Sequence, residues 1–181
     1  MTKTELAKQM REASYLTGEF KLRSGNISNF YWDKYRFESD PALLTAIAAE
    51  MAKLLPSSCD GLAGLELGGI PLATALSLQT GIPCFYVRKE AKTYGTCNLI
   101  EGGVKADSRL VVIEDVITTA GQVCTSIEQI RAEGYIVEDV VAVIDRQAGG
   151  EAKIKALGCS FASVFTLAEL EAVSERETCY K

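Results

Sequence analysis

The residues with the clearest chemical potential lie together in the run VVIEDVITTAGQ, residues 111 to 122. Its apolar, β-branched start predicts a buried strand that brings Glu114 and Asp115 to the carboxyl edge of a sheet. A loop of small and hydroxylated residues, 118 to 121, then opens a predicted helix. Small residues let backbone N–H groups approach an anion, and the helix N-terminus adds the positive end of its dipole. The run therefore predicts a phosphate-binding loop beside an acidic pair.

The alternative is an ordinary strand-to-helix turn in which a threonine caps the helix. The acidic pair argues against it, because two carboxylates beside a phosphate are unfavourable unless they bind hydroxyl groups or a cation. A sugar diol and Mg²⁺ would both satisfy that requirement.

A second candidate is the basic run RKEAK, residues 88 to 92, which places three cations within five residues. It opens a stretch of about twenty residues between predicted strands, and such long loops in a compact domain are usually functional or disordered. The stretch follows the carboxyl end of a strand, where open α/β sheets bind ligands. We expect a flexible lid over residues 88–108, the alternative being a solvated charged loop.

Composition excludes several classes of enzyme. The 181 residues include no histidine, which excludes Ser-His-Asp and Cys-His nucleophile systems and histidine zinc sites. The six cysteines form no CxxC pair. Gly64 and Gly69 have P-loop spacing, but Ile70 and Pro71 stand where lysine and a hydroxyl residue are needed, and no GxGxxG occurs.

Charge and hydropathy restrict the partners and the location. Nineteen basic against 24 acidic residues give a net charge of −5, so we expect no nucleic-acid and no membrane partner. The polar N-terminal run lacks the apolar core of a signal peptide, and no apolar run of about 18 residues occurs. We therefore expect a cytoplasmic protein.

The elements that must position these residues follow from periodicity. Residues 4–14 and 41–55 have helical spacing, the second after Asp40 and with Pro41 as its first residue, whereas residues 20–37 favour short strands and a turn. From residue 60 short apolar runs alternate with amphipathic helices, and 146–181 add a helix, a strand and a last helix. This pattern predicts a single α/β domain, 1–181, with a central, mostly parallel sheet flanked by helices.

With its neighbours, the run EDVITTAGQ resembles the diphosphate-sugar motif of type I phosphoribosyltransferases. The neighbours narrow the resemblance to the orotate phosphoribosyltransferase family. They are FKLRSGNISNFYWDKY, ELGGIPLATALS, YVRKEAKTYGTCNLIEG and VVAVIDRQAGG, and the resemblance covers roughly residues 15 to 170.

The resemblance implies transfer of a phosphoribosyl group from 5-phosphoribosyl 1-diphosphate (PRPP) to orotate, giving orotidine 5′-monophosphate and pyrophosphate in pyrimidine synthesis. It implies the type I phosphoribosyltransferase fold, with a small hood built from residues 15–37 and 158–170. It also implies a homodimer with shared active sites and Mg²⁺ as cofactor, held mainly by PRPP without a dedicated set of protein ligands. Displacement of pyrophosphate through a cationic sugar needs no protein nucleophile, which agrees with a chain without histidine.

The resemblance also implies roles for individual residues. The implied catalytic residues are Glu114, Asp115 and Lys92. The implied PRPP-binding residues are Leu67, Gly68, Gly69, Arg88, Lys89, Lys92, Tyr94, Glu114, Asp115, Val116, Ile117, Thr118, Thr119, Ala120, Gly121 and Gln122. The implied orotate-binding residues are Arg23, Tyr31, Trp32, Thr118 and Arg146.

Some positions depart from the family pattern. Tyr94 stands where many members carry histidine, and a phenol can donate a hydrogen bond but is no base at neutral pH. Ala120 stands where glycine is usual and Gln122 where serine or alanine is commoner; alanine costs on the order of 1 kcal/mol if residue 120 needs positive φ. Arg23 replaces a lysine or small residue.

Two other functions remain open: a phosphoribosyltransferase for another base, and a PRPP-binding regulator without catalysis. A cation at Arg146 favours a base that carries a carboxylate. The intact acidic pair and basic run favour an enzyme over a regulator.

Overall fold

A computed structural model of the chain describes residues 1–21, 25–91 and 98–175. Its centre is a six-stranded sheet in the order β5-β4-β3-β6-β7-β8, with every neighbouring pair parallel except β4 and β5. The strands are β3 (Gly61–Leu65), β4 (Cys84–Val87), β5 (Ile100–Glu101), β6 (Arg109–Ile117), β7 (Ile136–Asp145) and β8 (Ser160–Thr166). The predicted α/β fold with a mostly parallel sheet is confirmed.

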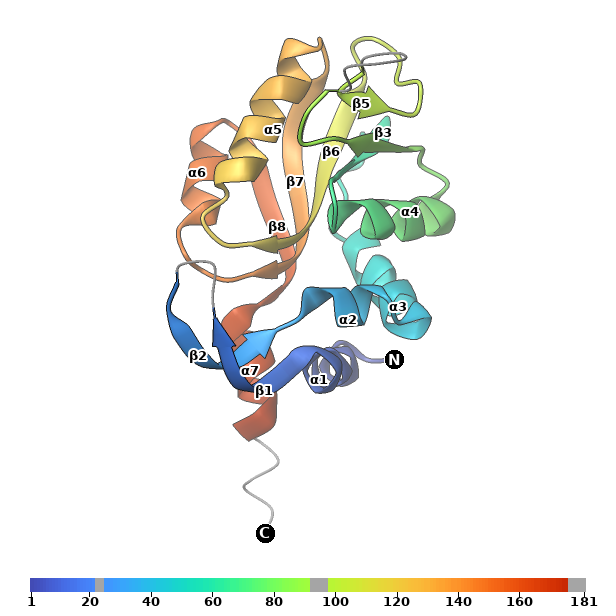
Figure 1. Cartoon of the computed structure of the whole chain (residues 1–181). Coiled ribbons are helices and arrows are strands. Elements are labelled where there is room, and N and C mark those ends of the chain that lie inside the picture. Colours follow the sequence, from blue (N-terminus) through green and yellow to red (C-terminus); the bar gives the residue numbers. More distant parts are fainter. Residues whose placement is uncertain (22–24, 92–97, 176–181) are drawn as a thin grey trace.

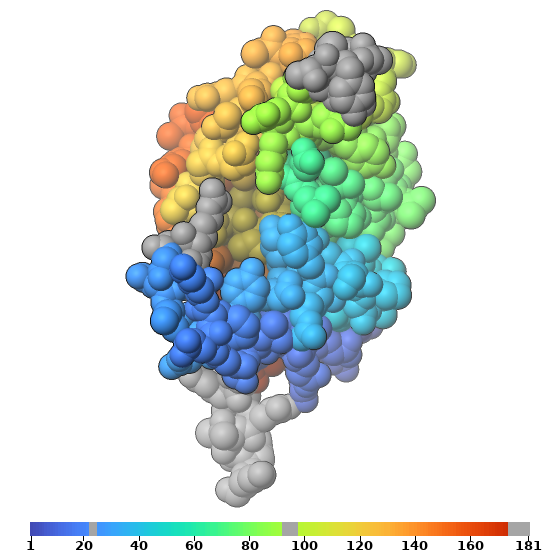
Figure 2. All heavy atoms as spheres, in the orientation of Figure 1, coloured from blue at the N-terminus to red at the C-terminus, as the bar shows by residue number. Residues whose placement is uncertain are grey.

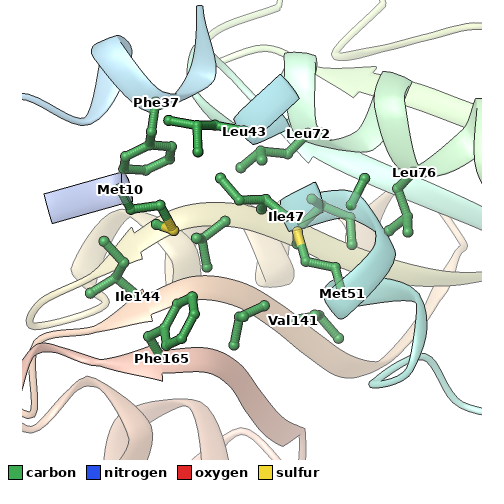
Figure 3. Packing of buried hydrophobic residues seen from close by; sticks show 14 of the residues in the cluster. Met10, Phe37, Leu43, Ile47, Met51, Leu72, Leu76, Val141, Ile144 and Phe165 are labelled. Carbon is green, nitrogen blue, oxygen red and sulfur yellow. The ribbon is translucent and has the colours of Figure 1, made fainter. Parts of the chain in front are cut away.

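Helices cover both faces of this sheet (Figure 1). One face packs against α3 (Pro41–Ala52) and α4 (Gly69–Thr80), and the other against α5 (Gly121–Ala132) and α6 (Gly150–Ala156). The strands are apolar at consecutive positions because alternate side chains enter two separate cores. Val111 and Ile113 enter the core with α3 and α4, whereas Leu110 and Val112 enter the core with α5. Figure 3 shows the first of these cores.

The start of α3 shows how local sequence sets these boundaries. The side chain of Asp40 accepts hydrogen bonds from the backbone N–H groups of Ala42 and Leu43, at 2.8 and 3.0 Å. Pro41 occupies the first turn, where a missing N–H costs nothing. The predicted helix therefore begins where Asp40 and Pro41 place it.

The N-terminal elements gather at the end of the sheet to which the parallel strands run (Figure 1). Two antiparallel strands, β1 (Tyr15–Lys21) and β2 (Ile27–Trp32), form a small separate sheet. The ring of Tyr15 stacks on Phe30 and meets Trp32 edge-on, with centroids 5.4 and 5.6 Å apart. Next to them, α1 (Lys3–Ser14) packs against α7 (Leu167–Glu175).

Two sequence predictions for this end of the molecule differ from the structure. The segment 20–37, expected to form short strands and a turn, also contains most of the helix α2 (Lys34–Glu38), which is too short to show a period and is held by burial of Phe37. Of the segment 158–170 expected in the hood, Ser160–Thr166 instead forms the edge strand β8, paired with β7. Backbone pairing with β7 assigns that strand to the central sheet.

Within the described residues, no helix is both long and apolar enough to span a membrane.

Candidate active site

Glu114 and Asp115 lie in the last part of β6, at the carboxyl edge of the sheet. Successive residues of a strand point to opposite faces, and the contacts of the two side chains follow that rule. Glu114 lines a small hollow with Val123 and Ser126 of α5. Asp115 is buried on the face of α4, where its carboxylate lies against Gly68. The two side chains therefore leave the strand on opposite sides, although their carboxyl groups remain close enough at the sheet edge to share a hydrogen bond.

The hollow beside Glu114 brings together residues from four segments of the chain. Besides Glu114, it is lined by Glu66 after β3, Arg88 and Lys89 after β4, and Gln122 at the start of α5. Figure 2 shows the surface hollowed between the blue N-terminal segment and the green segment that follows β4, with yellow atoms of the β6 region at its floor. Four residues expected to bind PRPP thus meet at one place.

The predicted phosphate loop connects β6 with α5. Thr118, Thr119, Gly121 and Gln122 are exposed, whereas Ala120 is buried with φ 55° in the left-handed region. Alanine there costs on the order of 1 kcal/mol, which is the strain expected if residue 120 needs positive φ. No side chain in the described part of the chain caps α5 at this end. The first N–H groups of α5 are therefore open to an anion.

Not every residue of this run can offer its side chain to a ligand. Ile117 is fully buried, and Val116 packs against the core that contains α3 and α4. The side chain of Ile117 is therefore closed to a ligand, and that of Val116 is only partly exposed.

The turn from β3 to α4 passes very close to β6. A Cβ atom at Gly68 would lie 1.6 Å from Oδ2 of Asp115, and one at Gly69 would lie 2.2 Å from the backbone oxygen of Ile113. Leu67 before them is exposed and follows a cis peptide bond from Glu66. Glycine at 68 and 69 is therefore required by packing against β6.

The basic run begins beside this turn. The backbone N–H of Lys89 donates to the Glu66 carboxylate at 3.0 Å, and the Arg88 guanidinium donates to Glu101 of β5 at 3.0 Å. Arg88 is thus held on a strand of the predicted lid, whereas Lys89 is exposed. The predicted site residues Lys92 and Tyr94 lie outside the described residues.

The residues expected to bind orotate are spread over two regions. Arg146 follows β7 and is exposed, and its backbone N–H donates to the Ile117 oxygen at 2.8 Å, so it adjoins the phosphate loop. Asp145 accepts from the backbone N–H of Gln147 at 2.8 Å, and among the described residues no ion pair holds Arg146. Tyr31 is exposed on β2, whereas Trp32 packs against the main core. Arg23 lies outside the described residues.

The helix α2 places two further ionisable residues, Lys34 and Glu38, beside Glu114 and Asp115 at the edge of the sheet. The Lys34 ammonium donates to Oδ2 of Asp115 and forms an ion pair with it. Burial works to lower the pKa of Lys34, but the hydrogen bond and charge of Asp115 outweigh burial and raise it. Lys34 therefore stays protonated in the neutral range.

Glu38, one turn after Lys34, is buried, and its Oε1 has no hydrogen-bond partner among the described residues. Burial and the charge of Asp115 raise the pKa of Glu38 to about 8. Burial, followed by the charge of Asp115, also raises the pKa of Glu114 well above its usual value. The cluster therefore holds fewer negative charges at neutral pH than its three carboxyl groups suggest.

Comparison with known proteins identifies the family, although no family model matches the chain. An orotate phosphoribosyltransferase from a Nocardioides species is 49% identical over 170 residues, covering 94% of this chain and 95% of that protein. The chain belongs to the orotate phosphoribosyltransferase family.

Solved structures agree with this orotate phosphoribosyltransferase assignment. The orotate phosphoribosyltransferase of Mycobacterium tuberculosis in complex with PRPP has a TM-score of 0.80 and 31% identity, covering 93% of this chain and 98% of that one. UMP synthase of Leishmania donovani has a TM-score of 0.85 and 32% identity over the whole of this chain. The chain spans 40% of that longer protein.

Sequence reasoning missed Lys34 and Glu38, the two residues of α2 that act on Glu114 and Asp115. Asp33, a residue type that often precedes helices, and the apolar Phe37 were the available signals. Neither indicated that Lys34 would reach Asp115, which lies 81 positions away in the chain.

Within the described residues, no group of three cysteine, aspartate or glutamate side chains could hold a metal ion. Lys34 occupies Oδ2 of Asp115, and the backbone N–H of Val116 donates to Oδ1. Both oxygens of the Asp115 carboxylate therefore already accept hydrogen bonds from the protein.

Proposed function

We propose that this protein transfers the phosphoribosyl group of PRPP to orotate, giving orotidine 5′-monophosphate and pyrophosphate for pyrimidine synthesis. The observation that carries the proposal is one juxtaposition at the sheet edge. The open N-terminus of α5, with Thr118 and Thr119 before it, adjoins the acidic pair and the hollow that Lys89 lines. These are the groups that a phosphorylated sugar with a diphosphate leaving group requires.

The proposed mechanism rests on positioning and electrostatics. The loop 118–122 binds the 5-phosphate through backbone N–H groups and hydroxyls. Asp115 and Glu114 bind the ribose hydroxyls and stabilise the positive charge that develops on the sugar carbon as pyrophosphate leaves. Lys89 and Lys92 neutralise the departing diphosphate, and a ring nitrogen of orotate is the nucleophile. No side chain has to form a bond to the substrate.

Arg146 is proposed to bind the carboxylate of orotate. It is exposed beside the phosphate loop, and a planar guanidinium suits a carboxylate in two-point contact. Tyr31, Trp32 and Arg23 are proposed to form the hood over the base. Trp32 would contribute by packing, because it lies against the core.

Mg²⁺ is the proposed cofactor, held mainly by PRPP. When bound it would neutralise charge on the diphosphate. The chain itself contributes Lys89, which is exposed and available to bind the diphosphate.

We also propose a homodimer in which the lid 88–108 of one subunit completes the site of its partner. Mixing inactive Lys92→Ala chains with inactive Asp115→Asn chains should restore part of the activity, because one mixed site then has both native residues. No recovery after demonstrated subunit exchange would exclude shared sites.

The direct test of the function is loss of orotate absorbance on adding PRPP and Mg²⁺. Adenine, hypoxanthine and uracil serve as competing bases under the same conditions. Consumption of orotate with release of pyrophosphate is expected. Turnover of a different base would assign another specificity, and tight PRPP binding without turnover of any base would indicate a regulator.

A further inference from the structure

Lys34 connects the N-terminal elements to the acidic edge of the sheet. It is the first residue of α2, directly after Asp33, and only two residues after Trp32 of β2. Its ammonium forms an ion pair with Asp115, whose side chain is 1% exposed, while the Lys34 side chain is 32% exposed. One end of this contact is therefore fixed in the core, and the other can exchange partners with a ligand.

The surroundings make Lys34 the cation that acts on this carboxylate among the described residues. The groups that act electrostatically on the pair are Tyr35 and Glu38 on α2 and Glu114 on β6, and Asp33 acts in turn on Glu38. The neighbours of α2 in α1 and α3 contribute apolar side chains. Figure 3 shows Met10, Leu43 and Ile47 around Phe37. An uncharged residue at 34 would leave several carboxyl groups facing one another.

The rest of the Asp115 carboxyl group is already in contact with protein groups, including hydrogen bonds with Glu38 and Glu114. Gly68 approaches Oδ2 so closely that even a methyl group would overlap it. Oδ1 accepts the N–H of Val116. A ribose hydroxyl that binds Asp115 must therefore share the carboxylate with Lys34 or displace its ammonium, which then lies beside the sugar and its leaving group.

We infer that Lys34 is a positioning residue for the phosphoribosyl donor: it holds the Asp115 carboxylate in the orientation that receives the ribose, and it exchanges with the sugar when PRPP binds. The inference rests on the proposed function. Its specific consequence is that replacing Lys34 lowers kcat/KM for PRPP and leaves the affinity for orotate nearly unchanged.

The test compares Lys34→Met, Lys34→Arg and the wild type in steady-state kinetics with each substrate varied in turn. Lys34→Met should lower kcat/KM for PRPP by about 10- to 100-fold, as expected for loss of one charged hydrogen bond. KM for orotate should change by less than about twofold, because the base lies elsewhere. Lys34→Arg, which keeps the charge, should recover a large part of the loss.

The pH dependence gives a second readout that a structural role would not produce. Without the Lys34 charge, the carboxyl groups around Asp115 hold protons more tightly, so the acid limb of the rate profile should move to higher pH in Lys34→Met. The control is Lys155→Met, which removes an exposed lysine paired with Glu151 on α6. That variant should keep both the rate and the profile.

The possible outcomes distinguish a failure of the inference from a failure of the proposed function. Wild-type protein that makes no orotidine 5′-monophosphate would overturn both. Active wild type with an unchanged kcat/KM for PRPP in Lys34→Met, or an equal loss for both substrates, would overturn only the inference. If Lys34→Met fails to fold, Lys34→Gln replaces it, since the amide can still donate to Asp115. Wild-type kinetics in that uncharged variant would also refute the role.

Discussion

Replacing Gly68 with alanine tests how closely the β3–α4 turn must approach the acidic edge. The added Cβ would lie 1.6 Å from Oδ2 and 2.5 Å from Cγ of Asp115, whereas real Cβ contacts stay beyond 3.0 Å. The carboxylate must therefore move by at least about 1.4 Å, which is enough to break its hydrogen bond to Lys34. A hydrogen bond between charged groups contributes about 1.5 to 3 kcal/mol.

That energy gives the size of both expected effects. Gly68→Ala should lower kcat/KM for PRPP by about 10- to 100-fold, because Asp115 leaves the position that receives the ribose. It should also lower Tm by roughly 3 to 12 °C, at about 2–4 °C per kcal/mol for a chain of this size. Initial rates at varied PRPP and a thermal melt of the same preparation measure the two effects.

Gly134→Ala is the matched control. Gly134 has φ +89°, and a Cβ atom there would meet nothing within 4 Å. This variant should lose about 1 kcal/mol of stability through backbone strain and keep its rate. Gly68→Ala with wild-type kcat/KM, or with a loss that Gly134→Ala reproduces, would refute the steric argument.

Three further substitutions test separate parts of the site. Asp115→Asn should lower kcat by about 10² to 10³ while the protein stays folded, as seen by circular dichroism; near-normal turnover would remove Asp115 from the proposed mechanism. Arg146→Ala should raise KM for orotate by about 10- to 100-fold and leave KM for PRPP nearly unchanged, and the reverse pattern would place Arg146 on the phosphate side. Glu38 has its pKa raised to about 8, so its contribution to stability is present below the usual pKa and is lost as pH rises towards 8. Glu38→Gln should therefore gain about 1 to 2 kcal/mol over the wild type by pH 8 in urea unfolding, after allowance for screening, and a gain that does not grow with pH would contradict this.

The long elements of the fold could be predicted because their patterns are strong. Alternation of apolar strands with amphipathic helices from residue 60 onward matches β3 to α6, and Asp40 with Pro41 marks the start of α3. Ala120 illustrates what the type of a single residue can predict. Because it is alanine, the sequence predicted the energetic cost of a positive φ, but only the structure supplied the value of 55°.

The missed parts depend on contacts between distant segments. A five-residue helix such as α2 has too few turns for a period, and burial of Phe37 supplies the stabilisation that its local sequence does not. The strand β8 has a clear pattern, but the sheet to which it belongs is decided by pairing with β7. The ion pairs of Lys34 with Asp115 and of Arg88 with Glu101 likewise join separate elements, so spacing could not indicate them.

Glu114 and Asp115 have different surroundings at the sheet edge, so their order in the chain has a structural consequence. The shorter acid enters the cramped side, where Gly68 leaves no spare volume, and the longer acid enters the hollow beside Arg88 and Gln122. Exchanging the two residues would keep composition and net charge, but it would force the extra methylene of glutamate against the β3–α4 turn and withdraw a carboxylate from the hollow. A swapped pair would therefore form a different site, because the two positions accept side chains of different length.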